Sequence, residues 1–381
     1  MAGYIFSLDN ENALYECIKN GVYSTNLKKL NKEGLWRTHH EGTMADYLGM
    51  KEGDNVYFFI KRKIYGIGEL VNIDYDCKFL NYINADKPYN YNFEKKREEL
   101  LWGDSEENLN NRLICTFKPK PNFFRNGIDM DDILELGGKN IKILRAFWKL
   151  SFIKVDEIEN FELKSIILRK NEEFIDSKDF DSVFEFSDKT HNKITDKITR
   201  DYEFNYRNII DYCSDGNYVK HEMALEAALV NLINKNEINL LGNWDYISHQ
   251  VIASPFKAID YMDKIDLFGY KYLEGYKIIS KYLVVEIKKD IIDKNSVQQL
   301  MKYVDWINNE YANKDYSMIE AFLVGHKIKE DALEYKNNYA LRNYTIGRRP
   351  FIEKVWNNIR FIEYEFDYIN KNLIFKEIKK D

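Results

Sequence analysis

Short apolar runs separated by turn residues dominate the N-terminal part of the chain. Residues 55–60 and 66–71 lie between Gly, Asp and Lys, and residues 112–117 and 149–154 continue the pattern. Runs of this length, rich in β-branched and aromatic residues and bounded by turn formers, are typical of strands. The pattern therefore predicts a compact β-barrel-like domain over residues 1–167.

Residues 168–216 have a different composition, charged and rich in Asn but poor in Val and Leu. A segment of this kind lacks the strong apolar periodicity that buries a helix or strand against a core. We expect it to be a linker that contains a polar helix.

Helical and strand-like patterns alternate in the C-terminal part. Residues 221–233 place apolar side chains at the 3.6-residue period of an amphipathic helix, namely Leu225, Ala228, Leu229, Leu232 and Ile233. Strand, strand, helix, strand, helix and strand patterns follow, at residues 264–267, 282–288, 296–308, 318–325, 329–337 and 359–364. This order predicts a mixed sheet flanked by helices over residues 217–381. The whole chain is thus expected to be a multidomain protein of the α/β (α+β) class.

Composition supports a folded, two-domain protein. The chain has 381 residues, 45% of them hydrophobic, with 56 Lys plus Arg against 62 Asp plus Glu and a formal net charge of −6. This excludes a disordered chain and a protein coated with basic residues, but a local basic groove would still suffice to bind nucleic acid. Apolar runs are far shorter than the roughly 20 residues of a membrane helix, and the N-terminal stretch lacks the basic region of a signal peptide.

The four cysteines favour a reduced, cytoplasmic protein. They are far apart in the sequence, with no C-x-x-C pair and no His at zinc-ligand spacing: Cys17, Cys77, Cys115 and Cys213. We therefore expect neither disulfides nor structural zinc. The adjacent His39 and His40 have no partner at ligand spacing, so a metal site is not expected there either.

The most informative chemistry lies in two neighbouring predicted strands. Asp266 is in the first, while Glu286 and Lys288 project from one face of the second, because side chains alternate along a strand. The E-x-K pattern alone is weak evidence, since it starts at five positions: Glu94, Glu162, Glu286, Glu334 and Glu377. Only the Glu286 copy ends an apolar strand, follows an Asp by 20 residues and precedes an amphipathic helix. A structural ion pair is the alternative explanation.

Two carboxylates and an ammonium at one end of a sheet suit metal-assisted hydrolysis of a phosphodiester. Carboxylate oxygens bind Mg²⁺, which keeps waters and accepts phosphate oxygens as further ligands. The cation stabilises developing charge and helps to form a nucleophilic hydroxide. Lys288 could hold that water or neutralise the charge of the transition state.

With these residues, the segment 218–366 resembles the PD-(D/E)XK nuclease superfamily, and most closely its NucS-type branch. The positions that match the motif are Glu226, Asp266, Glu286, Lys288, Gln299 and Tyr303. The resemblance implies that Asp266, Glu286 and the backbone carbonyl of Ile287 ligate Mg²⁺, for which Mn²⁺ would substitute. It further implies that Lys288 handles the attacking water, Glu226 contacts a second metal or its water, and Gln299 positions the metal-bound water or the DNA strand.

Some assignments stay open. Glu222 lies one turn before Glu226 on the same helix face and could be the helix carboxylate instead. Asp260 and Asp263 are close to Asp266 in sequence, but a solvated loop is the better interpretation of both. Arg342, Arg348 and Arg349 form a dense Arg cluster suited to phosphate contacts, or equally a solvated loop. Tyr303 is grouped with them as a candidate for nucleic-acid contact.

The N-terminal part carries a weaker resemblance. A G-D-x-V turn and strand at residues 53–56 and a G-x-G-E pattern at residues 66–69 are similar to EVE and other PUA-like domains. Such barrels bind nucleic acid and often hold a modified base, which needs an aromatic wall and polar groups at the base edge. The candidates for a base pocket are Trp36, Trp102, Trp148, Arg37 and Arg112, although each Trp could equally belong to a core.

Together, the two parts resemble a modification-dependent restriction endonuclease. The resemblance implies a Mg²⁺-dependent endodeoxyribonuclease whose N-terminal domain selects the site. Double-stranded DNA, with or without modified bases, would be its substrate, and a double-strand break would require a homodimer. The alternatives are a mismatch- or structure-specific repair endonuclease of the NucS type and a catalytically silent nucleic-acid reader.

Overall fold

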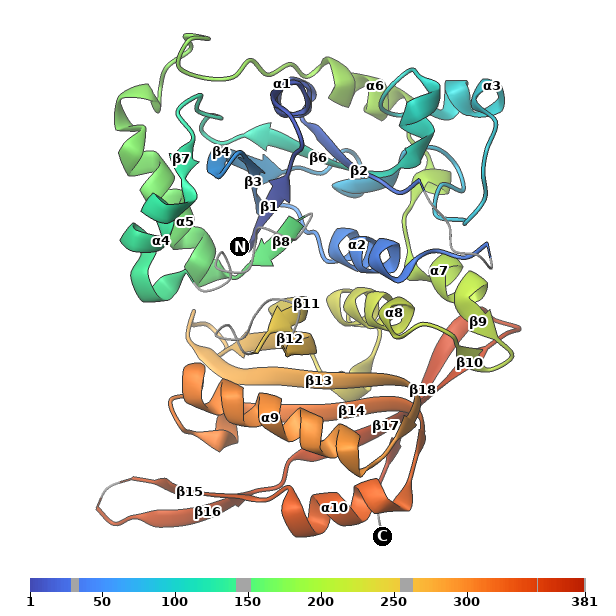
Figure 1. Ribbon diagram of the computed structural model, residues 1–381, viewed down its shortest axis with the longest axis vertical. Coiled ribbons are helices and arrows are strands. Elements are labelled where there is room, and N and C mark those ends of the chain that lie inside the picture. The colour runs from blue at the N-terminus through green and yellow to red at the C-terminus, as the bar shows by residue number, and fades with distance from the viewer. Residues whose placement is uncertain (29–33, 142–151, 254–262, 348, 380–381) are drawn as a thin grey trace. The chain divides into compact units, whose positions relative to one another are not determined.

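The chain forms two compact units in a computed structural model that describes residues 1–28, 34–141, 152–253, 263–347 and 349–379 (Figure 1). Unit 1 consists of Met1–Gly34 and Asp46–Phe204, and unit 2 of Leu35–Ala45 and Asn205–Asp381. The predicted linker is therefore divided, with residues 168–204 in unit 1 and residues 205–216 in unit 2. Within the described ranges, no helix combines the length and apolar character needed to cross a membrane.

Unit 1 is built on one sheet. Its strands are β1 (Gly3–Ser7), β2 (Val22–Asn26), β3 (Asn55–Ile60), β4 (Lys63–Leu70), β5 (Lys78–Leu80), β6 (Asn111–Pro119), β7 (Ile128–Asp129) and β8 (Phe152–Val155). The main order is β2-β6-β4-β3-β1-β8, with β5 on β6 and β7 on β4. β1 and β3 run parallel, and the other pairs are antiparallel. In the described residues the path ends at β2 and β8, so the sheet is an open half-barrel rather than a closed barrel.

Helices complete unit 1. They are α1 (Glu11–Asn20), α3 (Phe93–Lys96), α4 (Met130–Gly137), α5 (Glu157–Lys170) and α6 (Lys189–Lys197). Leu163 and Ile167 of α5 share a buried cluster with Tyr57 of β3, and Ile194 of α6 shares another with Ile114 of β6. Val183 also belongs to the first cluster and Tyr202 to the second, so residues 168–204 pack within the unit instead of forming a linker.

Unit 2 contains a six-stranded sheet in its described part. The strands are β11 (Tyr246–Ile252), β12 (Lys264–Tyr272), β13 (Ile279–Ile292), β14 (Ile319–Ile328), β17 (Ile359–Asp367) and β18 (Asn372–Ile378), in the order β11-β12-β13-β14-β17-β18. β13, β14 and β17 run parallel, while the flanking pairs are antiparallel. The four predicted strands correspond to β12, β13, β14 and β17, with the third predicted to begin one residue before β14, whereas β11 and β18 were not predicted.

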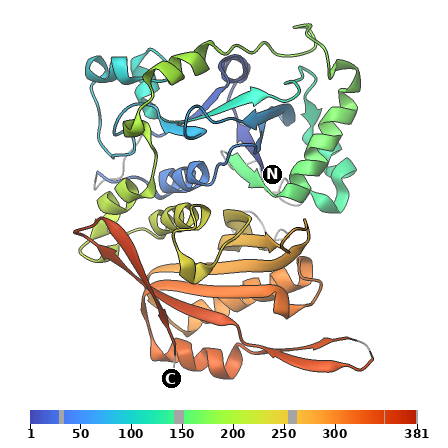
Figure 2. The same ribbon diagram turned by 180° about the vertical axis from the view of Figure 1, so that it is seen from behind.

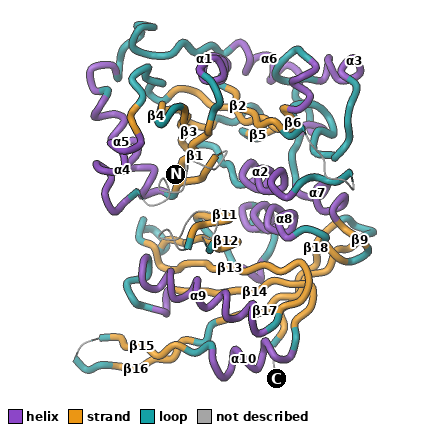
Figure 3. The backbone as a smooth tube through the Cα atoms, viewed as in Figure 1, coloured by secondary structure: helices purple, strands orange, loops and turns teal. Residues whose placement is uncertain are grey.

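Helices and two hairpins complete unit 2, and the β15–β16 hairpin extends away from the sheet (Figures 2 and 3). The helices are α2 (Thr38–Leu48), most of which falls in unit 2, α7 (Tyr206–Cys213), α8 (Glu222–Asn234), α9 (Lys294–Glu310) and α10 (Glu330–Tyr339). The hairpins pair β9 (Ser214–Asp215) with β10 (Tyr218–Val219), and β15 (Arg342–Ile346) with β16 (Ile352–Trp356). Neither hairpin was predicted.

Helix α8 differs from the expected amphipathic helix. Every residue from Ala224 to Ile233 is buried, including Glu226 and Asn231. The helix packs on β11, β13 and α7. Gly42 of α2 also lies close to Met223 of this helix, since a Cβ atom added to Gly42 would be 3.5 Å from Sδ of Met223. A helix covered on several sides needs no polar stripe, so its buried carboxylate requires a separate explanation.

Candidate active site

Strands β12 and β13 bring the predicted acidic residues together. Leu267 pairs with Val285 in the antiparallel register, which places the next residues along, Asp266 and Glu286, on adjacent strands. Oδ2 of Asp266 accepts a 2.7 Å hydrogen bond from the N–H of Ile287. Glu286 is fully buried and Asp266 half-buried. Both carboxylates therefore belong to residues of strands rather than of a loop.

Lys288 lies beside Glu286, as the alternation of side chains along a strand predicts. Its Nζ is 2.6 Å from Oε1 of Glu286, and its side chain keeps 26% of its exposure. The pairing of β13 with β14 is regular up to Lys288 and then shifts before Ile291. Irregular pairing of this kind often re-aims side chains beside functional sites.

Helix α8 and strand β11 add further groups. Glu226 of α8 is 2% exposed. Nε2 of Gln250 donates to both carboxylate oxygens of Glu226, at 3.0 Å each, and to Oδ1 of Asp266 at 3.3 Å. Nδ1 of His249 lies 3.5 Å from Oε2 of Glu226. One amide thus joins the helix carboxylate to the strand carboxylate.

Glu222, the other helix carboxylate, lies against β13. Its Oε1 accepts a 3.4 Å hydrogen bond from the N–H of Lys289, and its charge contributes to a raised pKa of Glu286. Both Glu222 and Glu226 therefore act electrostatically on the same group, but the contact through Gln250 ties Glu226 to Asp266.

The acidic cluster consists of Glu222, Glu226, Asp266 and Glu286 with Lys288. Without a cation, the interactions among its charges are unfavourable. Burial raises the pKa of Glu286 to about 7, although Lys288 opposes the shift. Burial and then the charges of Glu226 and Glu286 raise the pKa of Asp266 well above its ordinary value, against the hydrogen bond from Ile287. Burial lowers the pKa of Lys288, but Glu286, Glu222 and Asp266 together raise it above its ordinary value. Four carboxylates thus face one ammonium group.

One carboxylate oxygen in the cluster is left over. Oε2 of Glu286 is buried and has no hydrogen-bond partner among the described residues. Burying an unpaired carboxylate oxygen is costly. A divalent cation would satisfy this oxygen and offset the excess negative charge, so the donor set fits a hard metal ion such as Mg²⁺.

Helix α9 carries the predicted Gln and Tyr next to β13. Nε2 of Gln299 donates a 3.0 Å hydrogen bond to the hydroxyl of Tyr303. Tyr303 is 3% exposed, and its pKa is raised by burial and by the charges of Glu286 and Asp266, with Gln299 opposing. Tyr303 is thus buried near the acidic cluster, where it orients Gln299. It does not offer the exposed surface expected of a nucleic-acid contact.

One residue of the predicted Arg cluster, Arg342, is already engaged by a carboxylate. Arg342 forms a two-pronged ion pair with Asp305 of α9, with both N–O distances 2.8 Å. This pair fastens β15 to α9. Arg349 is exposed next to β16, whereas Arg348 and Asp260 lie outside the described residues. Asp263, directly before β12, is half-buried.

The described base-pocket candidates differ in their surroundings. Arg112 is 3% exposed, and its guanidinium donates to the backbone carbonyls of Ala85, Lys87 and Tyr89. Trp102 packs against a core cluster of unit 1. Trp36 is buried and Arg37 exposed in the segment that belongs to unit 2. Trp148 lies outside the described residues.

Gln250 is the site residue that sequence reasoning missed. It stands between the pairs His249–Leu267 and Val251–Ile265, opposite Asp266, with a left-handed φ of 51°. Such a backbone is uncommon for a residue other than Gly and often marks a functional site. The only signal in the sequence was the polar triplet Ser248-His249-Gln250 within an otherwise apolar run.

Comparisons with known proteins add little. No family model and no curated protein matches the chain. Among solved structures, a repair endonuclease from Pyrococcus abyssi is similar over 30% of this chain and 43% of that chain, at 23% identity and a TM-score of 0.22. A TM-score this low does not establish a shared fold, and the matched region spans less than half of the archaeal protein. Function must therefore be argued from the acidic cluster.

Proposed function

We propose that this chain is a Mg²⁺-dependent nuclease that hydrolyses phosphodiester bonds in DNA. The observation that supports the proposal best is the buried acidic cluster, in which Oε2 of Glu286 has no hydrogen-bond partner among the described residues. An arrangement that costs stability in the metal-free protein is typical of a functional site.

Asp266 and Glu286 would hold the cation, with the carbonyl of Ile287 as a further ligand and Mn²⁺ as a substitute. Bound there, Mg²⁺ would stabilise negative charge on phosphate oxygens and lower the pKa of a bound water. Glu226 is joined to Asp266 through the amide of Gln250. From this position Glu226 would accept a hydrogen bond from a water of the metal or bind a second ion.

Lys288 is suited to act on the water or on the phosphate. Its ammonium lies 2.6 Å from Glu286 and is partly exposed, so it can reach a group at the mouth of the cluster. A fixed ammonium stabilises charge that develops on a phosphate in the transition state. Gln299, whose amide donates to the hydroxyl of Tyr303, would position water or a DNA strand.

A catalytically silent reader is the alternative from another class. A scaffold without chemistry gains nothing from four carboxylates packed around one lysine, since replacing them would relieve repulsion and desolvation. The acidic cluster therefore favours an enzyme over a reader.

The first experiment compares nicking of supercoiled plasmid DNA by wild type and three variants: D266N, E286Q and K288M. We expect wild type to cut with Mg²⁺ or Mn²⁺ and not in EDTA, and each variant to lose on the order of 100-fold in rate or more. The matched control is E334Q, because Glu334 begins an E-x-K copy on the exposed side of α10. Full activity of D266N and K288M, or cutting by wild type in EDTA, would refute the assignment.

We further propose that substrate choice resides in unit 1 and depends on modified bases, as in restriction enzymes that cut modified DNA. The support is the similarity of residues 53–56 and 66–69 to EVE and PUA-like domains. The test offers unmodified duplexes and duplexes with 5-methylcytosine or 5-hydroxymethylcytosine. Cutting restricted to modified DNA is expected, whereas equal cutting of unmodified DNA would contradict modification dependence.

A repair endonuclease is the second candidate, because Glu226, Asp266, Glu286, Lys288, Gln299 and Tyr303 resemble the motif of the NucS-type branch. Mismatched duplexes in the same panel distinguish the two, since a repair enzyme would prefer them. One acidic cluster per chain cuts one strand, so double-strand breaks would require two copies of the chain. Their rate would then rise with the square of protein concentration below the dimer dissociation constant.

A further inference from the structure

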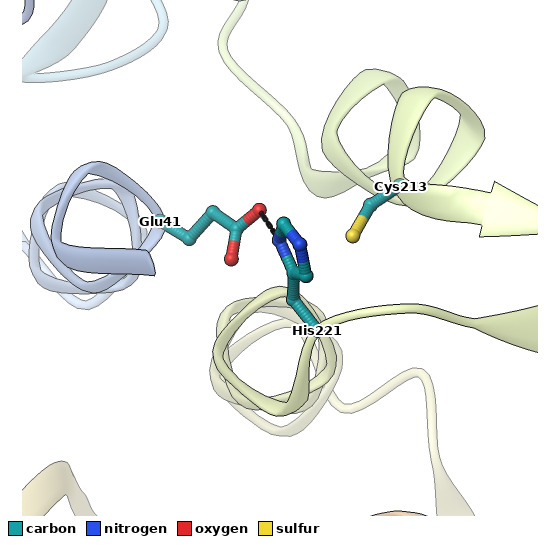
Figure 4. A group of neighbouring side chains, drawn as sticks. All are labelled: Glu41, Cys213 and His221. Carbon is teal, nitrogen blue, oxygen red and sulfur yellow. Dashed lines mark hydrogen bonds and ion pairs between the residues drawn. The ribbon is translucent and has the colours of Figure 1, made fainter. Parts of the chain in front are cut away.

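A second group of potential metal ligands lies in unit 2, apart from the acidic cluster. Glu41 of α2, Cys213 at the end of α7 and His221 directly before α8 converge, with the imidazole between the carboxylate and the thiol (Figure 4). The ligand atoms of the three side chains are all within 4.8 Å of one another. Oε1 of Glu41 is 2.7 Å from Nδ1 of His221.

The β9–β10 hairpin explains why Cys213 and His221 meet. Val219 pairs with Ser214, and the N–H of Lys220 donates a 2.8 Å hydrogen bond to the carbonyl of Cys213. The two ligands thus stand at the two ends of one hairpin. Glu41 arrives from a segment 172 residues before Cys213, which is why spacing in the sequence gave no sign of the group.

The burial of Glu41 and Cys213 destabilises the folded protein when no cation is bound. Glu41 is 1% exposed and Cys213 is 2% exposed. Oε2 of Glu41 is buried and lacks a hydrogen-bond partner among the residues that the structure describes. An unsatisfied buried carboxylate oxygen beside a buried thiol is a combination that a metal ion would resolve.

We infer that Glu41, Cys213 and His221 bind one Zn²⁺ ion. Thiolate, imidazole and carboxylate are the ligand types that zinc accepts, whereas Mg²⁺ prefers oxygen alone. Tetrahedral zinc with these ligands needs donor atoms ~3.3–3.8 Å apart, so side-chain movements of about 1 Å suffice. The His221 side chain keeps 21% exposure, which leaves room for water as the fourth ligand.

A Cys-His-Glu catalytic triad would use the same residue types. The thiolate of such a triad must reach a substrate, and reactive cysteines are partly exposed with a lowered pKa. Cys213 is only 2% exposed, so its sulfur could not reach a substrate, and the arrangement suits a metal ligand rather than a nucleophile.

The proposed zinc ion has a structural role that is separate from the proposed nuclease chemistry. Residues Leu35–Ala45 group with unit 2 although both flanking stretches belong to unit 1. The metal would fasten this segment to the start of α8, the helix that carries Glu226. A shared metal stabilises a fold by binding only when its ligands are assembled.

The test titrates Co²⁺ into metal-free full-length protein with Mg²⁺ in excess, which occupies the acidic cluster. We expect one Co²⁺ per chain, a thiolate-to-cobalt charge-transfer band and the d–d intensity of a tetrahedral site. C213S should remove the charge-transfer band, and E41Q and H221N should weaken binding by ~10-fold or more. C17S is the matched control, because Cys17 is also a buried cysteine but lies in α1 of unit 1, and it should retain the full signal.

Two further measurements keep the inference open to refutation. Should C213S fail to fold by circular dichroism, the wild-type spectrum decides: no thiolate band, or a band that C17S removes, overturns the site. E286Q should lose nuclease activity and keep the cobalt band, so failure of the zinc site and failure of the nuclease proposal give different results.

Discussion

At the scale of single residues, Gln250 is the residue that links the two sides of the acidic cluster. Its amide donates to Glu226 and Asp266 from a left-handed backbone. We predict that Q250A and Q250G both reduce the rate of DNA cleavage, by ~10-fold or more, because the carboxylates lose their shared donor. Both variants are assayed under the conditions that saturate wild type with Mg²⁺.

The same pair of variants separates backbone strain from the loss of the amide. Glycine adopts a left-handed backbone without the penalty of a side chain, so Q250G should be more stable than Q250A by about 1 kcal/mol. Urea unfolding in EDTA measures the difference. Equal stability of the two variants would show that the conformation of residue 250 stores no strain.

Glu286 gives a pH-dependent prediction for the metal-free protein. Its pKa is raised to about 7 in the folded state, above the ordinary value near 4.3 of an unfolded chain. Below pH ~4 Glu286 is protonated in both states, and the free energy of unfolding is undiminished. As the pH rises through about 7, the folded protein must also ionise Glu286, and this part of the free energy of unfolding is lost. E286Q, which cannot ionise, should be more stable than wild type at pH 8 in EDTA, on the order of 2–3 kcal/mol.

Thermal unfolding from pH 5 to pH 8 measures this effect. The advantage of E286Q should shrink towards pH 5, and Mg²⁺ should raise the melting temperature of wild type but not of E286Q. A wild type that is the more stable protein at pH 8 in EDTA would contradict the unfavourable charge assigned to the acidic cluster.

At the scale of elements, helix α9 places Gln299 and Tyr303 and depends on its N-cap. The carboxylate of Asp293 accepts hydrogen bonds from the N–H groups of Asn295 and Ser296. We predict that D293A lowers stability by about 1 kcal/mol and reduces cleavage less than E286Q does. D331A is the control, because Asp331 is exposed in the first turn of α10 and does not cap that helix. A similar loss in both variants would mean that the cap is unimportant.

Elements with a strong local pattern could be predicted, and those shaped by distant partners could not. The apolar run at 282–288 fixes the alternation that puts Glu286 and Lys288 on one face of β13. The polar triplet Ser248-His249-Gln250 interrupts the apolar pattern of β11, so the sequence did not predict this strand. Its pairing with β12 is seen only in the structure. Helix α8 has the expected period, yet its polar face is buried by α7, the sheet and residues Leu35–Ala45.

The candidate site shows the same division. Asp266, Glu286 and Lys288 are recognisable because they lie within 23 residues of one another on paired strands. Glu41 and His221 are 180 residues apart, so no local pattern could relate them. Arg112 was a candidate for a base pocket, but it is buried and its guanidinium donates to three backbone carbonyls, a set of contacts that depends on tertiary packing.

At the scale of the whole molecule, each unit is discontinuous in sequence. Residues Leu35–Ala45 contribute to unit 2 from within the N-terminal part, and Glu41 pairs there with His221, 2.7 Å away. A fragment that begins at residue 205 therefore lacks part of its own fold, although it contains the whole acidic cluster. The fragment loses this hydrogen bond, and a hydrogen bond of this kind contributes on the order of 1 kcal/mol.

We predict that the fragment 205–381 melts at a lower temperature than unit 2 in the full chain and binds a hydrophobic dye. A synthetic peptide of residues 35–48 should raise the melting temperature when it is added in trans, because it restores α2. The same peptide with E41Q is the control and should restore less, since it lacks the carboxylate that bonds to His221. If the fragment alone were as stable as unit 2 in the full chain, the segment would be dispensable, and a division of the chain near residue 216 would describe the folding units better than the discontinuous one.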